Sequence, residues 1–105
     1  MAVLVIVNVK GVKKQDYENL RKEIKWEQNQ PKGAILHMAG IGENGDMQVA
    51  DMWETAEDFN NFAATRLGPA TQKLKLPQPE AKIYPLHNAN VFEQVEKYRM
   101  AGMTR

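Results

Sequence analysis

An Asn-Gly pair between two apolar runs is the feature that most narrows the folds open to this chain. Asn44 and Gly45 lie between residues 34–42 and residues 47–54, and each run is long enough for a strand. Such a pair is the strongest short-range signal for a β-hairpin, because both central positions of a type I′ turn need a positive φ. The sequence therefore predicts two antiparallel strands at Ala34–Gly42 and Met47–Glu54.

A strand and a helix are predicted before this hairpin. Ala2–Val9 is rich in β-branched residues and predicts a strand. From Lys13 to about Lys25, apolar residues recur three and four positions apart, as they do on one face of a helix. Trp26 lies opposite this apolar stripe, so either the helix ends before it or Trp26 contacts another protomer or partner.

A second helix and a last strand follow the hairpin. Thr55, with an acidic residue three positions later, resembles a capping box that begins a helix. We expect Gly68-Pro69 to break this helix and to open a second short one, because proline suits a first helical position. The last strand is predicted at Ala81–Leu86, where Pro85 favours a sheet edge or an early end.

The resulting order is β-α-β-β-α-β, the ferredoxin-like α+β pattern, with an antiparallel sheet and both helices on one face. A chain of 105 residues fits one domain, which we place at residues 1–92. Residues 93–105 form a C-terminal tail in which Val95, Tyr98 and Met103 favour a short helix.

The predicted strands are apolar on both faces. Pairing Gly42 with Met47 would put Asp51 and Trp53 on one face and His37 on the other. Two helices can cover only one face, and a second copy of the chain is the simplest way to bury the other apolar face. We therefore expect a homodimer that buries either the Val3/Val5/Val7 face or the Leu4/Ile6 face, with His37 at its seam.

Composition excludes several classes of function. The formal net charge is +1, which does not suggest a nucleic-acid partner. No apolar run is long enough for a membrane span, and Ala2–Val7 lacks the flanks of a signal peptide. The chain has no cysteine and only two histidines, without metal-ligand spacing, so we expect no metal site. A cytoplasmic location is compatible with the absence of cysteine.

Three segments resemble the antibiotic-biosynthesis-monooxygenase-like superfamily, whose members are dimeric α+β barrels. The Asp-Met-Trp-Glu-Thr run of residues 51–55, leading into residues 56–59, is similar to the superfamily's Trp-Glu-Ser/Thr helix entry. Residues 66–70 and 83–88 are similar to a group of small bacterial proteins within it. The resemblance covers about residues 2–92 and specifies the fold more closely than the function.

The resemblance implies cofactor-independent oxidation of a phenolic or quinol-like substrate as one activity. Such a pocket needs an apolar lining, an aromatic ring for stacking and a polar group that handles a proton. Haem-degrading relatives use an Asn on the first strand, which Asn8 could match, together with a helical Trp and a helical His. Phe62 and Gln72 stand near the last two positions, so haem is not expected, and we expect no cofactor at all.

Candidate site residues come from the third strand and the second helix. Trp53 and Phe62, with Phe59, would line a pocket, or would fill the core at the helix entry. Arg66 falls between Phe59 and Phe62 on a helical wheel and so should point inward, toward Asp51. The pair would either anchor a polar ligand group, with Asp51 as general base, or form a structural ion pair.

Asn8 is a second candidate catalytic residue, as a hydrogen-bond donor to a ligand on an inward face, although a core Asn bonded to the backbone fits equally. The expected function is binding of a small apolar or aromatic molecule, with cofactor-independent monooxygenation as the enzymatic form. The alternative is a non-catalytic ligand-binding or structural dimer. A cavity of at least ~300 Å³ lined by Trp53, Phe62 and polar groups would favour ligand chemistry over that alternative.

Overall fold

A computed structural model of the protein describes residues 1–100. The strands are β1 (Val3–Val9), β2 (Ala34–Ile41), β3 (Met47–Trp53) and β4 (Glu80–Pro85). The helices are α1 (Lys14–Ile24), α2 (Ala56–Phe62) and α3 (Gly68–Lys73), with the π-helical turn η1 (Ala63–Leu67) and the 3-10 helix η2 (Glu93–Tyr98). The predicted order of elements is confirmed, while Met103 of the predicted tail helix lies outside the described residues.

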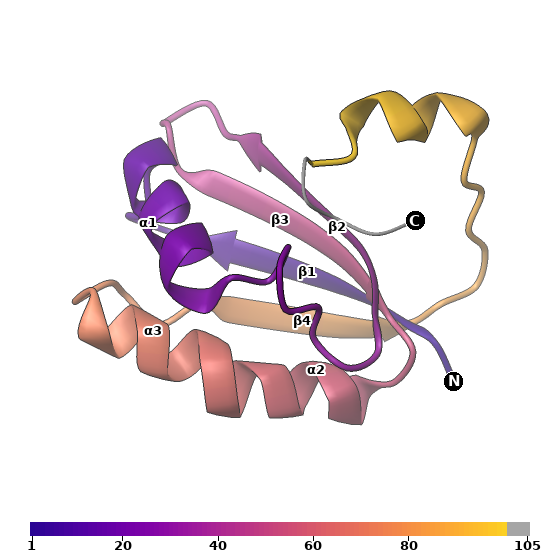
Figure 1. Ribbon diagram of the computed structural model, residues 1–105, viewed down its shortest axis with the longest axis horizontal. Coiled ribbons are helices and arrows are strands. Elements are labelled where there is room, and N and C mark those ends of the chain that lie inside the picture. Colours follow the sequence, from indigo (N-terminus) through magenta and orange to yellow (C-terminus); the bar gives the residue numbers. More distant parts are fainter. Residues whose placement is uncertain (101–105) are drawn as a thin grey trace.

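The four strands form one antiparallel sheet in the order β2-β3-β1-β4 (Figure 1). β2 and β4 are its edges, and Pro85 is the last residue of β4. Proline is tolerated there because an edge strand has one row of backbone groups that needs no ladder partner. The predicted effect of Pro85 on its strand is therefore confirmed.

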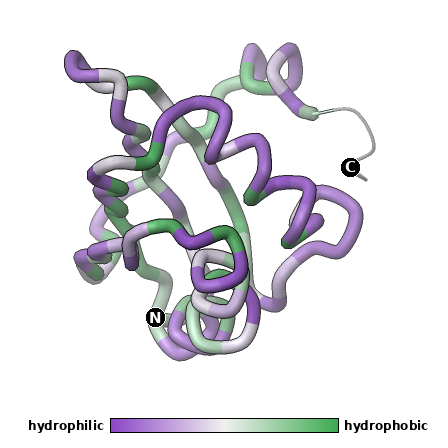
Figure 2. The backbone as a smooth tube through the Cα atoms, turned by 90° about the vertical axis from the view of Figure 1, so that its left-hand side faces the viewer, coloured by the Kyte–Doolittle hydropathy of each residue, from purple (hydrophilic) through white to green (hydrophobic). Residues whose placement is uncertain are grey.

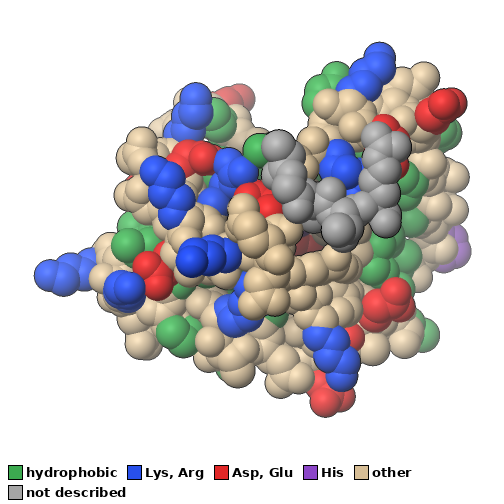
Figure 3. Space-filling model, viewed as in Figure 1, with side chains coloured by type: hydrophobic (Ala, Val, Ile, Leu, Met, Phe, Trp, Pro, Cys, Tyr) green, Lys and Arg blue, Asp and Glu red, His purple; other side chains and the backbone are tan. Residues whose placement is uncertain are grey.

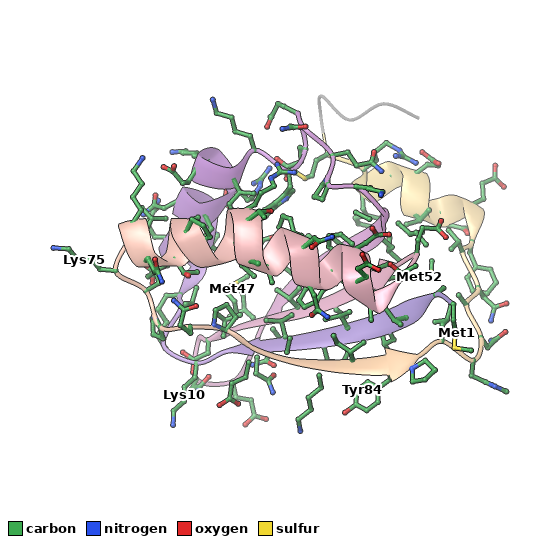
Figure 4. All side chains as sticks on the ribbon, turned by 90° about the horizontal axis from the view of Figure 1, so that it is seen from below. Met1, Lys10, Met47, Met52, Lys75 and Tyr84 are labelled. Carbon is green, nitrogen blue, oxygen red and sulfur yellow. The ribbon has the colours of Figure 1, made fainter. Side chains whose placement is uncertain are left out.

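One face of the sheet is covered by the helices. Val3, Val5, Val7 and Val9 are buried on that face, and the intervening residues of β1 point the other way. Figure 4 shows α2 and α3 on one side of the sheet, while Tyr84 points to the opposite side. This alternation is typical of a one-sided antiparallel sheet, and the predicted ferredoxin-like α+β class is confirmed.

The second helical region is continuous from Ala56 to Lys73, so the predicted break at Gly68-Pro69 is wrong. It begins as predicted, since the Thr55 side chain accepts a hydrogen bond from the Asp58 amide at 3.0 Å. A proline lacks the amide hydrogen and crowds the preceding turn. The wider turn of η1, in which the Gly68 amide donates to the Ala63 carbonyl, accommodates it.

The predicted hairpin forms, but with a different turn and register. The Gly42 amide donates to the Asp46 carbonyl, which leaves a three-residue loop with only Gly45 at positive φ. This geometry is a type I turn followed by a left-handed glycine, not the two-residue type I′ turn. Met47 therefore pairs with Ile41 instead of Gly42.

A shift of one residue changes the face on which every side chain of a strand lies. His37 is now directly opposite Asp51, on the helix-covered side of the sheet. The expected position of His37 at a dimer seam is thus wrong. A register irregularity between Ala34 and Leu36 also leaves Ile35 without a paired residue on β3, and it bends the start of β2.

The surface mixes charges of both signs. On the face shown in Figure 3, Lys and Arg side chains are interspersed with Asp and Glu. Figure 2 shows hydrophilic and hydrophobic residues alternating along the helices, as expected for helices with one buried side. Within residues 1–100, no helix combines the length and apolar character needed to cross a membrane.

Candidate active site

A cavity of about 270 Å³ lies between the sheet and the helices. Its walls come mainly from β1, β2, β3, α1, α2 and the segment that joins α1 to β2, and most of the lining is apolar. The polar side chains that line it include Tyr17, His37 and Asp51. The volume lies just below the range for ligand pockets, about 300–1,000 Å³. The expected lining by Trp53, Phe62 and polar groups is present, but the expected volume of at least ~300 Å³ is not reached.

Asp51 holds two side chains through its two carboxylate oxygens. Oδ1 lies 2.7 Å from Nδ1 of His37, and Oδ2 accepts a hydrogen bond from Nε1 of Trp53 at 3.1 Å. Asp51 is 7% exposed, so this carboxylate is nearly removed from water. A buried acidic group needs such partners, and here they orient His37 toward the cavity.

Tyr17 completes a line of three hydrogen-bonded groups. Its hydroxyl lies 2.6 Å from Nε2 of His37, and the two rings are parallel within 1°. An ionised Asp51 accepts a hydrogen from Nδ1, which leaves Nε2 of a neutral imidazole as an acceptor. This tautomer is assigned from the hydrogen-bond network; in it, the Tyr17 hydroxyl donates to His37.

Burial affects the acidity of Tyr17. Its side chain projects from α1, lines the cavity and is half-buried. Desolvation raises the pKa of the Tyr17 hydroxyl well above its usual value of 10.0, against a smaller lowering effect of Arg21. The group is therefore a neutral hydrogen-bond donor at physiological pH.

Trp26 forms an aromatic wall beside these groups. Its ring centroid is 5.6 Å from that of Tyr17 and 5.2 Å from that of His37. The chain reaches this position because α1 ends at Ile24 and Lys25 adopts a left-handed conformation. Of the two interpretations of Trp26, the early end of the helix is confirmed.

The predicted aromatic residues lie together at the floor of the cavity. Trp53 and Phe59 are each 3% exposed, and their rings meet edge to face at 5.6 Å. Phe62 lies 5.3 Å from Trp53 and is partly exposed. All three line the cavity. They therefore belong to the packed core and also border the space that a ligand would fill.

Arg66 does not meet Asp51, so the predicted ion pair is wrong. Its Nη2 atom donates to the carbonyl oxygens of Ile24 and Asn29, both at 2.9 Å. The side chain turns toward the end of α1 because that helix terminus offers backbone acceptors, and it does not line the 270 Å³ cavity. The register shift of β2 gives Asp51 a different partner, His37.

Asn8 is exposed on the face of the sheet away from the helices, so its expected inward position is also wrong. The burial alternation of β1 places every odd-numbered residue inward and Asn8 outward. The sequence analysis missed Tyr17 as a site residue and placed His37 at a dimer seam instead of in the site. The spacing that put Tyr17 on the buried face of α1 was visible, but its pairing with His37 depends on the hairpin register.

Within residues 1–100, no group of three or more His, Cys, Asp or Glu side chains is placed to hold a metal ion. The arrangement does contain a histidine held between a buried carboxylate and a tyrosine hydroxyl. A positioned histidine of this kind can accept a proton from a ligand hydroxyl. The site is thus suited to acid–base chemistry on an aromatic molecule.

Several solved structures with the same architecture are described as antibiotic biosynthesis monooxygenases or as a cofactor-independent oxygenase. A candidate antibiotic biosynthesis monooxygenase from Deinococcus radiodurans is 13% identical, with a TM-score of 0.58 over 88% of this chain and 98% of that one. SnoaB, a cofactor-independent oxygenase from Streptomyces nogalater, is 14% identical, with a TM-score of 0.57 over 84% and 94%. A conserved protein from Methanosarcina mazei Go1 is 20% identical, with a TM-score of 0.59 over 80% and 91%.

The chain therefore shares the fold of these solved structures, and the fold that the sequence resemblance implied is confirmed. No protein-family model and no curated protein sequence matches the chain. At these identities the likeness extends to the fold alone, and the activity must be argued from the site.

Proposed function

We propose that the protein binds a small aromatic molecule in this cavity and oxidises it with molecular oxygen, without a metal, haem or flavin. The observation that carries the proposal is His37, held at the wall of an apolar cavity by the Asp51 carboxylate at 2.7 Å. A deprotonated phenol or quinol can pass an electron to oxygen, so a base is the group that such a reaction needs from the protein. His37 with Asp51 supplies that base.

The size of the cavity narrows the substrate. A cavity of about 150 Å³ holds one benzene ring, and the space here is about 270 Å³. We therefore propose a substrate of one or two rings. Trp53 and Phe62 would contact its ring faces, with Phe59 supporting them. Asp51 acts by positioning His37, because its Oδ1 atom binds Nδ1 of the imidazole and its Oδ2 atom accepts the hydrogen bond of Trp53.

We also propose that the protein is a homodimer formed through the open face of the sheet. One row across this face is apolar from edge to edge: Leu36, Met52, Leu4 and Tyr84. A row at the other end of the strands is polar, with Asn8 opposite Gln48 and Glu80. A second copy that covers the apolar end would remove it from water. We also propose a cytoplasmic location, because a chain without cysteine is compatible with a reducing compartment.

The activity is tested with a panel of one-ring and two-ring phenols and quinols under oxygen. Oxygen uptake and mass spectrometry of the products are measured for the wild type, His37→Gln and His87→Gln. We expect the wild type to add oxygen to at least one substrate, and His37→Gln to lose about 10²–10⁴-fold in rate. His87 is exposed after β4, so His87→Gln is the matched control and should equal the wild type.

Two results would contradict the proposed oxidation. One is the absence of turnover with every substrate, and the other is an undiminished rate in His37→Gln. Binding without turnover would support the non-catalytic ligand-binding alternative.

A further inference from the structure

We propose that the Tyr17 hydroxyl is the group that contacts the substrate, and that it relays the proton of a neutral, hydroxyl-bearing aromatic molecule to His37. This inference rests on the proposed function and deepens it, because it names the contact atom and the ionisation state of the ligand that the site selects. Tyr17 would then be a catalytic residue, with Asp51 as a positioning residue.

The first argument is that His37 has no ring nitrogen left for a ligand. Nδ1 is bound to Asp51 at 2.7 Å and Nε2 to the Tyr17 hydroxyl at 2.6 Å. A substrate could reach His37 directly only by displacing Tyr17. The phenolic oxygen of Tyr17 has lone pairs beyond the one hydrogen that it donates, so it is the acceptor that the line of three groups presents to the cavity.

The second argument is that Tyr17 can receive one proton and give up another, so that it is neutral before and after the transfer. The substrate O–H bond breaks and its proton goes to Tyr17 Oη, while the original hydroxyl proton of Tyr17 goes to Nε2 of His37. His37 becomes an imidazolium whose Nδ1–H faces the Asp51 carboxylate. The substrate is left as an oxyanion that accepts a hydrogen bond from Tyr17.

The third argument concerns the resting state of the relay. Because burial raises the pKa of the Tyr17 hydroxyl, the phenolic proton stays in place at neutral pH. A tyrosine that ionised easily would instead present an anion to the cavity and repel the product oxyanion. The neutral hydroxyl suits a ligand that enters uncharged and becomes an anion only inside the site.

The fourth argument concerns the cations near the cavity. Arg21, which lowers the pKa of Tyr17, binds Glu18 at 2.7 Å and Glu27 at 2.9 Å. Arg99, which lines the cavity, pairs with Glu96 at 3.0 Å. Since each guanidinium faces a carboxylate of its own, the site favours a neutral ligand over one that is already anionic.

The experiment uses 4-nitrophenol, which develops a visible absorption band when it ionises. It is bound anaerobically to the wild type, Tyr17→Phe, His37→Gln and Tyr98→Phe at a pH where the free probe is mostly neutral. The matched ligand 4-nitroanisole lacks the hydroxyl. Tyr98 is 79% exposed, and Tyr98→Phe is the control for loss of a tyrosine hydroxyl.

In the wild type and in Tyr98→Phe, we expect the ionisation constant of the bound probe to rise about tenfold over that of the free probe, because an imidazolium forms nearby. In Tyr17→Phe it should return to within about twofold of the free value, while the affinity for 4-nitroanisole stays unchanged. In His37→Gln the probe should bind without ionising. Ionisation of the probe by His37→Gln as strong as in the wild type would also overturn the relay, so this variant keeps the proposal falsifiable if Tyr17→Phe fails to fold.

The relay is overturned if Tyr17→Phe ionises the probe as the wild type does, or if the wild type does not ionise it. These results separate the two proposals. Ionisation that requires Tyr17, without oxygen uptake by any substrate, would reject the oxygenase and keep the relay. Oxygenation of a substrate by Tyr17→Phe at the rate of the wild type would reject the relay and keep the proposed oxygenase.

Discussion

Arg66 joins the end of α1 to the second helical region. Ile24 is the last residue of α1, and its carbonyl is among those that a helix end leaves without an intrahelical partner. Arg66 donates to this oxygen and to that of Asn29, and its guanidinium carbon lies 5.6 Å from the centroid of the Phe62 ring. Its role in the structure is therefore to hold two helical segments and the α1–β2 connection together.

Replacement of this arginine should cost stability without any dependence on Asp51. We expect Arg66→Met to lower the free energy of unfolding by about 1–3 kcal/mol, the range for lost hydrogen bonds to a charged group. Because Arg66 and Asp51 share no hydrogen-bond partner, the effects of Arg66→Met and Asp51→Asn should add within about 0.5 kcal/mol.

A double-mutant cycle measured by urea unfolding checks this expectation. A coupling energy well above 0.5 kcal/mol between the two sites, in the sense of a lost attraction, would mean that Arg66 and Asp51 interact after all.

At the scale of the element, the π-helical turn explains why a glycine precedes Pro69. A Cβ atom added to Gly68 would lie 2.9 Å from the carbonyl oxygen of Ala63. That oxygen accepts the Gly68 amide hydrogen bond that defines the turn. The close approach of two backbone segments thus requires a residue without a side chain here.

We expect Gly68→Ala to destabilise the protein by about 1–2 kcal/mol, because the cost of overpacking exceeds the gain in helix propensity. Gly40 is the matched control, since an added Cβ there meets nothing within 4 Å. Gly40→Ala should be neutral or stabilising by up to about 1 kcal/mol. Urea unfolding of both variants measures the sign of each change in the free energy of unfolding. A Gly68→Ala variant that is more stable than the wild type would contradict the explanation given for the turn.

The hairpin shows what can be read from an element alone. The apolar runs and the Asn-Gly pair were sufficient to predict both strands, because turn chemistry and strand composition are local properties. The register was not predictable from them, since a two-residue loop and a three-residue loop suit the same residues. That difference of one residue decides whether His37 lies on the same face of the sheet as Asp51 or on the opposite face.

At the scale of the whole molecule, the open sheet face lets the proposed dimer be tested. Leu4 lies between Met52 and Tyr84 in the apolar row, and Asn8 lies in the polar row of the same strand. We expect the wild type to be a dimer at micromolar concentration and Leu4→Glu to be a monomer, because burying an unpaired carboxylate is unfavourable. Asn8→Glu, the control on β1, should remain dimeric.

Light scattering after size-exclusion chromatography gives the molar masses of the wild type, Leu4→Glu and Asn8→Glu. A monomeric wild type would reject the dimer. A dimeric Leu4→Glu would show that the two copies meet elsewhere.

The class of fold, the order of the elements and the role of Trp53, Phe59 and Phe62 as pocket or core residues were predictable from the amino-acid sequence. These depend on local periodicity, capping and turn signals, which act within a few residues. The hydrogen bonds that join Tyr17, His37 and Asp51, and the hydrogen-bond partners of Arg66, became visible only in the three-dimensional structure. Those contacts join α1, β2 and β3 across the fold, and their formation depends on a strand register and a helix end that no local pattern specifies.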